Sequence, residues 1–403
     1  MKTLNQKPLR VILPIVALFL LSCDGEKREE KQDLNPSGIL ESASGQYLLM
    51  AEMLNGQRSF PKTYNSHTER LQTSASDWWC SGFYPGTLFY LYEETGKQAL
   101  LDEGLRMLAL LEKEQYNTDT HDIGFMMNCS FGNINRIAPQ PAYREILLNS
   151  ARSLVTRFSP VVGCIRSHNR RPDEYIVIVD NMMNLELLFE ATRLSGDSSY
   201  HAVAVEHANT TLRNHFRPDN SLYHGINYNP ETGEVANYQA GQGYSEQSAW
   251  ARGQAWGLYG FTMAYRYTND LRYADQAIKM AEFQFSHPNM PDDFVPYWDY
   301  DAPAIPDALR DVSAAAINCS ALVELSLYTS GEMSEKYLGY ARKILVSLSS
   351  GKYTATAGSN GGFLLKHSAG NIPSMTEVDV PLTYADYYYV EALRRFGLVS
   401  RGF

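Results

Sequence analysis

Apolar residues recur every three or four positions through most of the chain beyond residue 36, a spacing that lines one face of an α-helix. The pattern predicts about twelve helices, at 37–53, 83–94, 98–114, 122–135, 143–157, 181–194, 198–215, 247–267, 271–287, 311–328, 335–349 and 384–396. Long segments rich in Gly, Asn and Pro are expected to be loops, at 54–76, 158–175, 216–246, 288–309 and 351–383. The run 176–179 is the most strand-like segment, but it stands too isolated to build a sheet.

Short polar turns join several neighbouring pairs of predicted helices, at 95–96, 195–197, 268–270 and 330–331. In each turn a Gly or Asn is suited to end one helix, and a polar residue is suited to cap the next. A simple bundle does not bury the apolar faces of so many antiparallel pairs, whereas six pairs stacked in a ring do so and leave a central funnel. We therefore predict an all-α fold, a six-hairpin (α/α) barrel or toroid. The alternative is an open superhelical array, which normally shows a tighter sequence period.

The first residues have the features of a bacterial lipoprotein signal. Lys2, Lys7 and Arg10 precede an apolar run at 11–21 that is too short to span a bilayer, and Leu-Leu-Ser lies directly before Cys23. We expect residues 1–22 to be a signal peptide and Cys23 to be acylated after cleavage. A lipid anchor would then hold the protein in the bacterial envelope, on the periplasmic or surface side of the outer membrane. The alternative is an ordinary secretory signal with an incidental cysteine.

The segment that follows, 23–36, is mostly charged and has little to bury, which predicts a flexible tether. Residues 37–403 are assigned to a single domain. The remaining cysteines are widely and irregularly spaced, so the sequence indicates neither a disulfide scaffold nor a metal site; they are Cys80, Cys129, Cys164 and Cys319.

Charge and composition narrow the possible partners. The formal net charge of −10 and the lack of a dense basic cluster argue against nucleic acid. An anionic substrate would therefore have to be held by local cationic side chains and backbone N–H groups. Aromatic residues make up 12% of the chain, with 27 tyrosines, which is typical of carbohydrate-binding surfaces and equally of a tyrosine-rich helical core.

The segment 241–260, GQGYSEQSAWARGQAWGLYG, concentrates side chains suited to an acidic sugar. Trp250 and Trp256 flank Arg252, and Gln242 lies close by in sequence. Aromatic faces stack on sugar rings, and a guanidinium donates two parallel hydrogen bonds to a carboxylate. The alternative is that two tryptophans six positions apart on a helix simply pack in the core.

Asp122 and Asp180 each begin a predicted helix, where an aspartate commonly caps the first N–H groups. The functional interpretation is a carboxyl pair for acid–base catalysis. A helix N-terminus lowers the pKa of an aspartate, whereas burial and a second carboxylate raise it. Catalysis therefore requires that the two aspartates face each other across a partly dry pocket. His224 lies in a predicted loop, where a lone histidine is more often simply solvated.

Six blocks of sequence, taken together, resemble the unsaturated glucuronyl hydrolases, glycoside hydrolase family 88. They are DWWCSGFYPG at 77–86, HDIGF at 121–125, DNMMNL at 180–185, the segment 241–260, DVPL at 379–382 and YADYY at 384–388. The resemblance runs from about residue 40 to the C-terminus. It implies the six-hairpin (α/α) barrel that the helical pattern predicts independently.

The resemblance also implies an activity. Family members act on oligosaccharides left by polysaccharide lyases, whose non-reducing sugar is an unsaturated uronic acid with a carbon 4–carbon 5 double bond. They hydrate this vinyl ether, after which the sugar ring opens and the next sugar is released. Glycosaminoglycan-type disaccharides are the favoured substrates, and the reaction needs no metal or organic cofactor.

The resemblance implies roles for individual residues. Asp180 is the general acid and base, and Asp122 is its partner, which keeps Asp180 partly protonated. The other residues expected to contact the sugar, through stacking or through its hydroxyl and carboxylate groups, are Trp79, His121, His224, Gln242, Arg252, Trp256 and Ser368.

Two departures from the family pattern concern the sugar next to the uronic acid. His168 occupies a place where the family often has a tryptophan. Members that prefer sulfated substrates have a Ser-x-x-Ser-x-Lys pattern, whereas this chain has Ser368, Asn371 and Pro373 there. A sulfate preference is therefore not predicted from this loop, although Arg170 and Arg171 are available to substitute.

Three alternatives to the glucuronyl hydrolase remain. An unsaturated rhamnogalacturonyl hydrolase would act on pectin fragments with the same barrel. A non-catalytic sugar-binding lipoprotein would keep binding without turnover. An (α/α)-barrel lyase would create the double bond instead of consuming it, which gives an absorbance change of the opposite sign.

Overall fold

A computed structural model describes residues 34–169, 171 and 173–402. The predicted signal peptide, Cys23 and residues 24–33 of the predicted tether lie outside the described residues. From Leu34 onward the chain forms one compact unit. No helix in the described ranges is long and apolar enough to cross a membrane.

The predicted helices are present with small shifts at their ends. The described α-helices are α1 (Pro36–Leu54), α2 (Phe83–Thr95), α3 (Gln98–Leu111), α4 (Asn133–Ile137), α5 (Pro141–Val155), α6 (Asn181–Ser195), α7 (Ser198–Asn214), α8 (Ala251–Thr268), α9 (Leu271–Ser286), α10 (Val312–Leu327), α11 (Gly331–Leu348) and α12 (Thr383–Ser400). Two predicted helices differ in type over part of their length. The end of the predicted helix 98–114 runs into the 3-10 helix η1 (Glu112–Tyr116), and most of 122–135 is the π-helix η2 (Gly124–Gly132). A further short 3-10 turn, η3, spans Asn360–Gly362.

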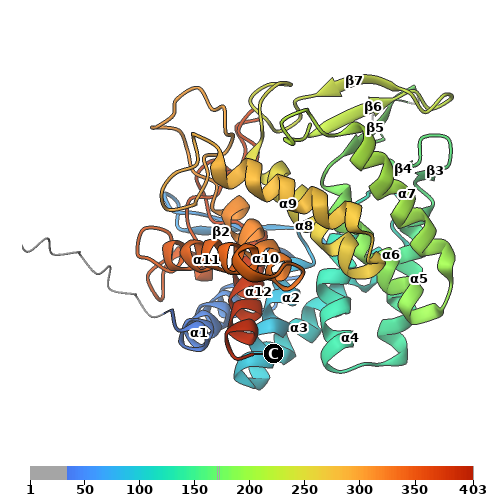
Figure 1. The fold of residues 1–403 in the computed structure, drawn as a ribbon. Helices are drawn as coiled ribbons and strands as arrows, with labels where there is room; N and C mark the ends of the chain where they lie inside the picture. The colour runs from blue at the N-terminus through green and yellow to red at the C-terminus, as the bar shows by residue number, and fades with distance from the viewer. Residues whose placement is uncertain (1–33, 170, 172, 403) are drawn as a thin grey trace, which may run out of the picture. The chain divides into compact units, whose positions relative to one another are not determined.

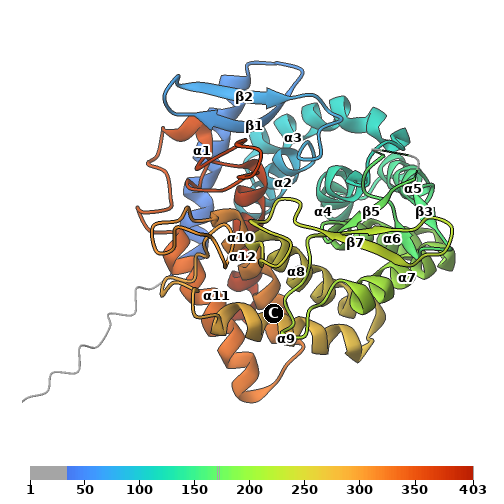
Figure 2. The same cartoon turned by 90° about the horizontal axis from the view of Figure 1, so that it is seen from above.

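The helices form two concentric layers. In the inner layer α2, η2, α6, α8, α10 and α12 contact one another in this order, and α12 contacts α2 again, so the ring is closed. The outer helices α3, α5, α7, α9 and α11 each pack on an inner partner, and α1 packs on both α12 and α2 (Figure 1). Seen from above, α8, α10 and α12 lie near the centre, and α7, α9 and α11 lie towards the periphery (Figure 2). The predicted six-hairpin (α/α) barrel is confirmed.

Burial follows the two layers. In the inner helix α10 every residue from Val312 to Ser326 is buried, which is typical of a helix surrounded by protein. In the outer helix α3 only one stripe is buried, formed by Leu100, Gly104, Met107, Leu108 and Leu111. The difference explains why the outer helices carry the clearer amphipathic pattern in the sequence.

Three small antiparallel sheets decorate the loops, and one of them corrects the sequence analysis. The pairs are β1 (Phe60–Asn65) with β2 (Arg70–Ser74), β3 (Phe158–Ser159) with β4 (Cys164–Ile165), and β5 (Tyr175–Ile178) with β6 (Gly225–Tyr228) and β7 (Val235–Gln239). The run 176–179 is therefore not isolated. Its partner strands come from 216–246, a segment predicted to be a loop, and neighbouring residues in the sequence give no sign of this distant pairing.

The β5–β6–β7 sheet places residues for the site. Ile178 pairs with Gly225, and the N–H of Val179 donates to the carbonyl of His224 at 2.9 Å. Asp180, two residues after β5, and His224, directly before β6, are consequently brought to the same end of the sheet. Gly225 also pairs with Gln239 at the end of β7, so the following residues 241 and 242 reach the same place.

A close contact between backbones fixes the position of η2. A Cβ atom at Gly82, at the start of α2, would lie 2.2 Å from the carbonyl oxygen of Met126 in η2. Only glycine allows α2 and the π-helix to approach this closely. A π-helix inside a helical ring often marks a functional site, and Asp122 lies just before this one.

Candidate active site

A cavity of about 580 Å³ collects most of the residues that the sequence singled out. Its lining consists of Lys62, Trp78, Trp79, His121, Asp122, His168, Ile178, Asp180, His224, Gly225, Gln239, Gly241, Gln242, Arg252, Gly370, Asn371, Ser374, Thr376, Glu377 and Tyr384. Both aspartates therefore face the same space, as the catalytic interpretation requires.

The N-terminal ends of the inner helices form this cavity. Asp180 directly precedes α6, Arg252 lies in the first turn of α8, and Tyr384 lies in the first turn of α12. Trp79 and Asp122 stand a few residues before α2 and η2. Unpaired N–H groups and the positive end of the helix dipole lie at each N-terminus. These helix ends supply local positive potential in a chain of net charge −10.

A larger cavity, of about 1110 Å³, lies at the opposite ends of the same helices. Most of its arginines are matched by glutamates, as in the pairs Arg394–Glu93 at 2.7 Å and Arg266–Glu186 at 3.0 Å. It contains neither aspartate of the candidate pair and no histidine. Size alone would favour this cavity, but the chemistry favours the smaller one.

Asp180 does not cap its helix. Its side chain makes no hydrogen bond to the N-terminal N–H groups of α6, and its Oδ2 instead lies 3.4 Å from Nε2 of His224. The imidazole of His224 is held from its other side, because the backbone N–H of Gln242 donates to Nδ1 at 2.7 Å. Gly241 makes this possible, since a Cβ there would lie 2.0 Å from Nδ1 of His224.

Asp122 does not act as a helix cap either. Thr120 Oγ1 donates to its Oδ2 at 3.3 Å, and Nδ2 of Asn184 approaches its Oδ1 at 3.5 Å. Asn184 on α6 supplies the acceptor at the start of η2, where its Oδ1 receives the N–H of Phe125 at 2.8 Å. The imidazole of His121 also lies close, with its Nε2 3.3 Å from Oδ1 of Asp122.

The surroundings shift the pKa values of the two aspartates in opposite directions. Burial raises the pKa of Asp122 to about 7, and the negative charge of Asp180 acts in the same direction. Burial also acts to raise the pKa of Asp180, but His224, His121 and Arg252 outweigh it and hold that pKa below its ordinary value. These directions differ from the expectation that Asp122 keeps Asp180 partly protonated, which stays a prediction.

The guanidinium of Arg252 donates its hydrogen bonds to other groups of the protein. Its Nη1 donates to Oδ2 of Asp311 at 3.1 Å and to the carbonyl of Ala369. Its Nη2 donates to Oε1 of Gln242 at 2.8 Å and to the carbonyl of Gly370. Four of its five N–H bonds are thus used. Arg252 contributes positive charge to the cavity and fixes the loop at 369–370. It has no free pair of N–H donors for the carboxylate-binding role that was predicted from sequence.

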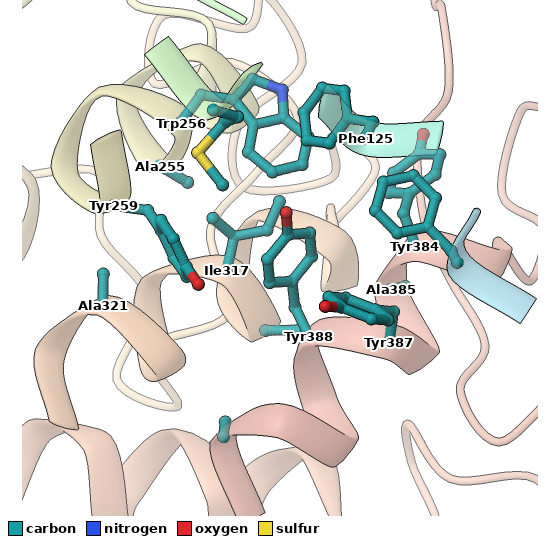
Figure 3. Close-up of a cluster of buried hydrophobic side chains, with 14 of the residues drawn as sticks. Phe125, Ala255, Trp256, Tyr259, Ile317, Ala321, Tyr384, Ala385, Tyr387 and Tyr388 are labelled. Carbon is teal, nitrogen blue, oxygen red and sulfur yellow. The ribbon is translucent and has the colours of Figure 1, made fainter. Parts of the chain in front are cut away.

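The tryptophans divide between the cavity and the core. Trp79 lines the cavity and packs on Tyr384, with ring centroids 4.8 Å apart. Trp256 is fully buried and is not a lining residue. It packs against Phe125 and Tyr388, as Figure 3 shows. The predicted stacking role of Trp256 is therefore replaced by core packing, the alternative that its helical spacing also allowed. Trp250 is buried too, under His224 and Arg252.

Of the other residues predicted to contact the sugar, three line the cavity and one does not. His121, His224 and Gln242 line the cavity, whereas Ser368 is fully buried and pairs through its backbone with Val380. The loop that contains Ser368 instead contributes Gly370, Asn371, Ser374, Thr376 and Glu377 to the lining. The predicted contact of Ser368 with the sugar is thus not supported by its position.

Several residues of the site were not predicted from the sequence. Lys62 on β1 lies 4.5 Å from the ring centre of Trp78 and 3.3 Å from Oε1 of Glu377, which brings β1 and the 370–377 loop together at the cavity. Asp311, the N-cap of α10, is fully buried against Arg252. The only sequence signal for Asp311 was its place before an apolar helix, which indicates a cap and not an ion pair.

No group of three or more His, Cys, Asp or Glu side chains in the described part of the chain is arranged to hold a metal. Cys80, Cys164 and Cys319 are buried and free, and Cys129 is half-buried and free. Burial raises the pKa of the Cys319 thiol, as expected for an unreactive buried cysteine.

Comparison with known proteins finds relatives over most of the chain. Residues 53–284 match the sequence profile of Glycosyl Hydrolase Family 88. The chain is 42% identical to an unsaturated glucuronyl hydrolase of Formosa agariphila, over 97% of this chain and 98% of that protein.

Two solved structures are similar over most of the chain. One is an unsaturated glucuronyl hydrolase specific for heparin, with 40% identity, a TM-score of 0.87, and coverage of 91% of this chain and 99% of that one. The other is a mutant unsaturated glucuronyl hydrolase of Streptococcus agalactiae complexed with dGlcA-GalNAc6S, with 27% identity, a TM-score of 0.76 and coverage of 98% of both chains.

Proposed function

The chain belongs to glycosyl hydrolase family 88 and removes unsaturated uronic acids from glycosaminoglycan-type oligosaccharides, and we propose that Asp122 and Asp180 are its acid–base pair. One observation carries the proposal. Both carboxyl groups line the same cavity with only 15% and 10% of their side chains exposed, and each has a histidine within 3.4 Å. Buried carboxyl groups with pKa values pushed apart are the usual basis for an acid and a base in one site.

The reaction needs one proton donor and one proton acceptor. A proton is delivered to carbon 4 of the unsaturated ring, and water adds at carbon 5. The hemiketal that forms then opens and releases the neighbouring sugar. The resemblance assigns both proton transfers to Asp180, with Asp122 as its essential partner, and positioned groups of this kind contribute roughly 10²–10⁴-fold to the rate.

The cavity also suits the charge and shape of the substrate. The uronic carboxylate is conjugated with the double bond, so nearby positive charge stabilises electron density that shifts during the reaction. Arg252 and the helix N-termini provide that charge, and Trp79 provides an aromatic face for the ring. Polar groups of Gln242 and the two histidines are available for sugar hydroxyls.

We further propose that heparin-derived disaccharides are preferred over chondroitin-derived ones. The heparin-specific structure is 40% identical to this chain, whereas the structure complexed with dGlcA-GalNAc6S is 27% identical. His168 and Asn371, which line the cavity, are places where the sequence departs from other members, so they are the first candidates for this preference.

The variant Asp180→Asn tests the catalytic role. We expect turnover to fall by at least about 10²-fold while unsaturated disaccharides still bind, because the amide keeps the shape of the carboxyl but cannot exchange protons. Asp119→Asn is a matched control, an exposed aspartate three residues from Asp122. Near-normal turnover in Asp180→Asn would exclude the acid–base role, and binding without turnover in the wild-type protein would indicate a sugar-binding lipoprotein.

We also propose that the mature protein is a lipoprotein of the bacterial envelope, anchored through an acylated Cys23. The charged n-region, the short apolar run and the residues before Cys23 support this proposal. Cys23→Ala should move the protein from the membrane to the soluble envelope fraction, and protease treatment of whole cells separates a surface from a periplasmic location. An unchanged membrane fraction in Cys23→Ala would contradict the anchor.

A further inference from the structure

The cavity that contains the two aspartates has a buried end and an exposed mouth. At the buried end, Asp180, His224 and Arg252 are almost completely covered by protein. At the mouth, the lining residues Trp78 and Ser374 are exposed, Trp78 to 39%. Because the unsaturated ring must reach Asp180, the sugar that is released from it (the leaving sugar) lies towards the mouth.

An ion pair lies among the lining residues of the mouth. Apart from the two aspartates and Arg252, the Lys, Arg, Asp and Glu side chains that line the cavity in the described part of the chain are Lys62 and Glu377. Nζ of Lys62, on β1, lies 3.3 Å from Oε1 of Glu377 in the 370–377 loop. The same Nζ lies 4.5 Å from the ring centre of Trp78. The ammonium is therefore held between an aromatic face and a carboxylate that balances its charge.

The backbone holds Glu377 at this position. The N–H of Gly370 donates to the carbonyl of Glu377 at 2.7 Å, and the carbonyl of Gly370 accepts from Arg252, so the loop is tied to the buried end of the cavity. A Cβ at Gly370 would lie 2.4 Å from the Cβ of Glu377, so glycine is needed to leave room for this side chain. Glu377 itself has a φ of +55°, which is uncommon for a glutamate. Residues held in such conformations are concentrated at active sites and ligand-binding sites.

We propose that the Lys62–Glu377 pair determines specificity for the leaving sugar and selects an unsulfated sugar over a sulfated one. A lone ammonium at the mouth would attract a sulfate group. Glu377 instead neutralises Lys62 and adds a carboxylate that repels a second anion, which is a repulsive element of specificity. The inference rests on the proposed function, because it concerns which substrate the same site accepts. It narrows the heparin-type preference to disaccharides without a sulfate on the leaving sugar.

The other cationic groups near the cavity do not replace Lys62. Arg252 is buried, and four of its five N–H bonds are used within the protein. Arg171, which the sequence offered as a substitute, is engaged in ion pairs and is not a lining residue, and Arg170 lies outside the described residues. His168 lines the cavity, but its ring packs edge-on against the buried His121, with centroids 5.6 Å apart. Lys62 is thus the cation best placed to meet a sulfate at the mouth.

A comparison of two substrates that differ by one sulfate tests the proposal. The substrates are unsaturated glucuronyl-N-acetylglucosamine with and without a sulfate at carbon 6 of the leaving sugar, and the measured quantity is the unsulfated-to-sulfated ratio of kcat/KM. We expect the wild-type enzyme to prefer the unsulfated disaccharide. Glu377→Gln keeps the size of the side chain and frees the ammonium, so the ratio should fall by about 10-fold. Lys62→Met leaves the carboxylate unpaired, so the ratio should rise by a similar factor.

The ratio separates a specificity role from a structural one. If the pair only ties β1 to the 370–377 loop, Glu377→Gln and Lys62→Met will slow both substrates equally and leave the ratio unmoved, which would overturn the proposal. A wild-type preference for the sulfated disaccharide would also overturn it. Glu41→Gln is the matched control, because Glu41 lies 2.6 Å from Nζ of Lys97 and neither residue lines the cavity. This variant should leave the ratio unchanged.

Two further measurements complete the test. The gain of the sulfated substrate in Glu377→Gln should shrink as the salt concentration rises, because salt screens a half-exposed ammonium; a gain that does not depend on salt would contradict the electrostatic argument. The ratio of the two Kd values, measured by calorimetry in the Asp180→Asn background, should shift in the same directions without any turnover. An inactive wild-type enzyme would contradict the proposed function, whereas an unmoved Kd ratio would contradict this inference.

Discussion

The buried pair of Asp311 and Arg252 gives the sharpest prediction for stability. Asp311 is fully buried, with its Oδ2 3.1 Å from Nη1 of Arg252, and its Oδ1 accepts the N–H of Ser313 at 3.0 Å and the hydroxyl of Ser313 at 2.6 Å. Asp311→Asn keeps an acceptor for the Ser313 bonds, because Asn is also a good N-cap. It removes the negative charge and leaves the guanidinium buried without its counter-ion.

Breaking a buried ion pair by removing one partner costs about 3–5 kcal/mol. We expect about 3 kcal/mol for Asp311→Asn, since the capping bonds survive. For a unit of this size each kcal/mol lowers Tm by about 2 °C, so the expected decrease is roughly 6 °C. The carbonyls of Ala369 and Gly370 share the same guanidinium, so the loop at the cavity should loosen and kcat/KM should fall as well.

Thermal unfolding followed by circular dichroism measures the effect, with Asp270→Asn as the matched control. Asp270 is the N-cap of α9 and accepts the N–H of Arg272 at 3.0 Å, as Asp311 does for Ser313, but its ion pair with Arg272 lies at the surface. Exposed pairs contribute about 0–1 kcal/mol, so the control should change Tm by no more than about 2 °C. Equal Tm values for the two variants would refute the argument that burial makes the Asp311–Arg252 pair important.

Three further predictions concern the cavity. Gly241→Ala should lower kcat/KM by at least about 10-fold, because the new Cβ displaces His224 and the φ of +57° is strained for alanine; an unchanged rate would contradict the packing argument. The acid–base pair must hold one proton and the pKa of Asp122 is raised to about 7, so kcat/KM should decrease as pH rises above about 7, whereas a rate still rising from pH 7 to 9 would contradict that requirement. Trp79→Ala should raise KM while Trp256→Phe should mainly lower Tm, because only Trp79 faces the cavity; similar KM changes in both would show that this distinction is wrong.

The helical part of the fold was largely predictable because it rests on local patterns. Apolar spacing and the short Gly- or Asn-containing turns located the helices, and the need to bury two layers of helices indicated the ring. The β5–β6 pairing was not predictable, since Tyr175 and Tyr228 meet only after the chain has passed through α6 and α7. This pairing is what brings His224 to Asp180, so a central contact of the site depended on it.

The candidate site was predictable in its residue types and less so in its arrangement. Asp122, Asp180 and Trp79 reach the cavity as predicted from sequence. Trp256 lies on the buried side of α8, although helical spacing alone allowed either side. Three of the four hydrogen-bond partners of Arg252, which are Asp311 and the carbonyls of Ala369 and Gly370, lie more than fifty residues away, so no local pattern revealed that its donors are occupied. The pKa of Asp180 likewise depends on residues distant in sequence, His224, His121 and Arg252.

The most direct test of the account is the ultraviolet absorbance of the carbon 4–carbon 5 double bond during incubation with the protein lacking residues 1–23. Unsaturated disaccharides from heparin, chondroitin and hyaluronan form the panel, and an unsaturated rhamnogalacturonan fragment covers the pectin alternative. We predict loss of absorbance with the glycosaminoglycan disaccharides, fastest with those from heparin, and no loss in Asp180→Asn. Loss with the pectin fragment alone or no change on the whole panel would contradict the account, and so would a gain of absorbance in a parallel incubation with the parent polysaccharides.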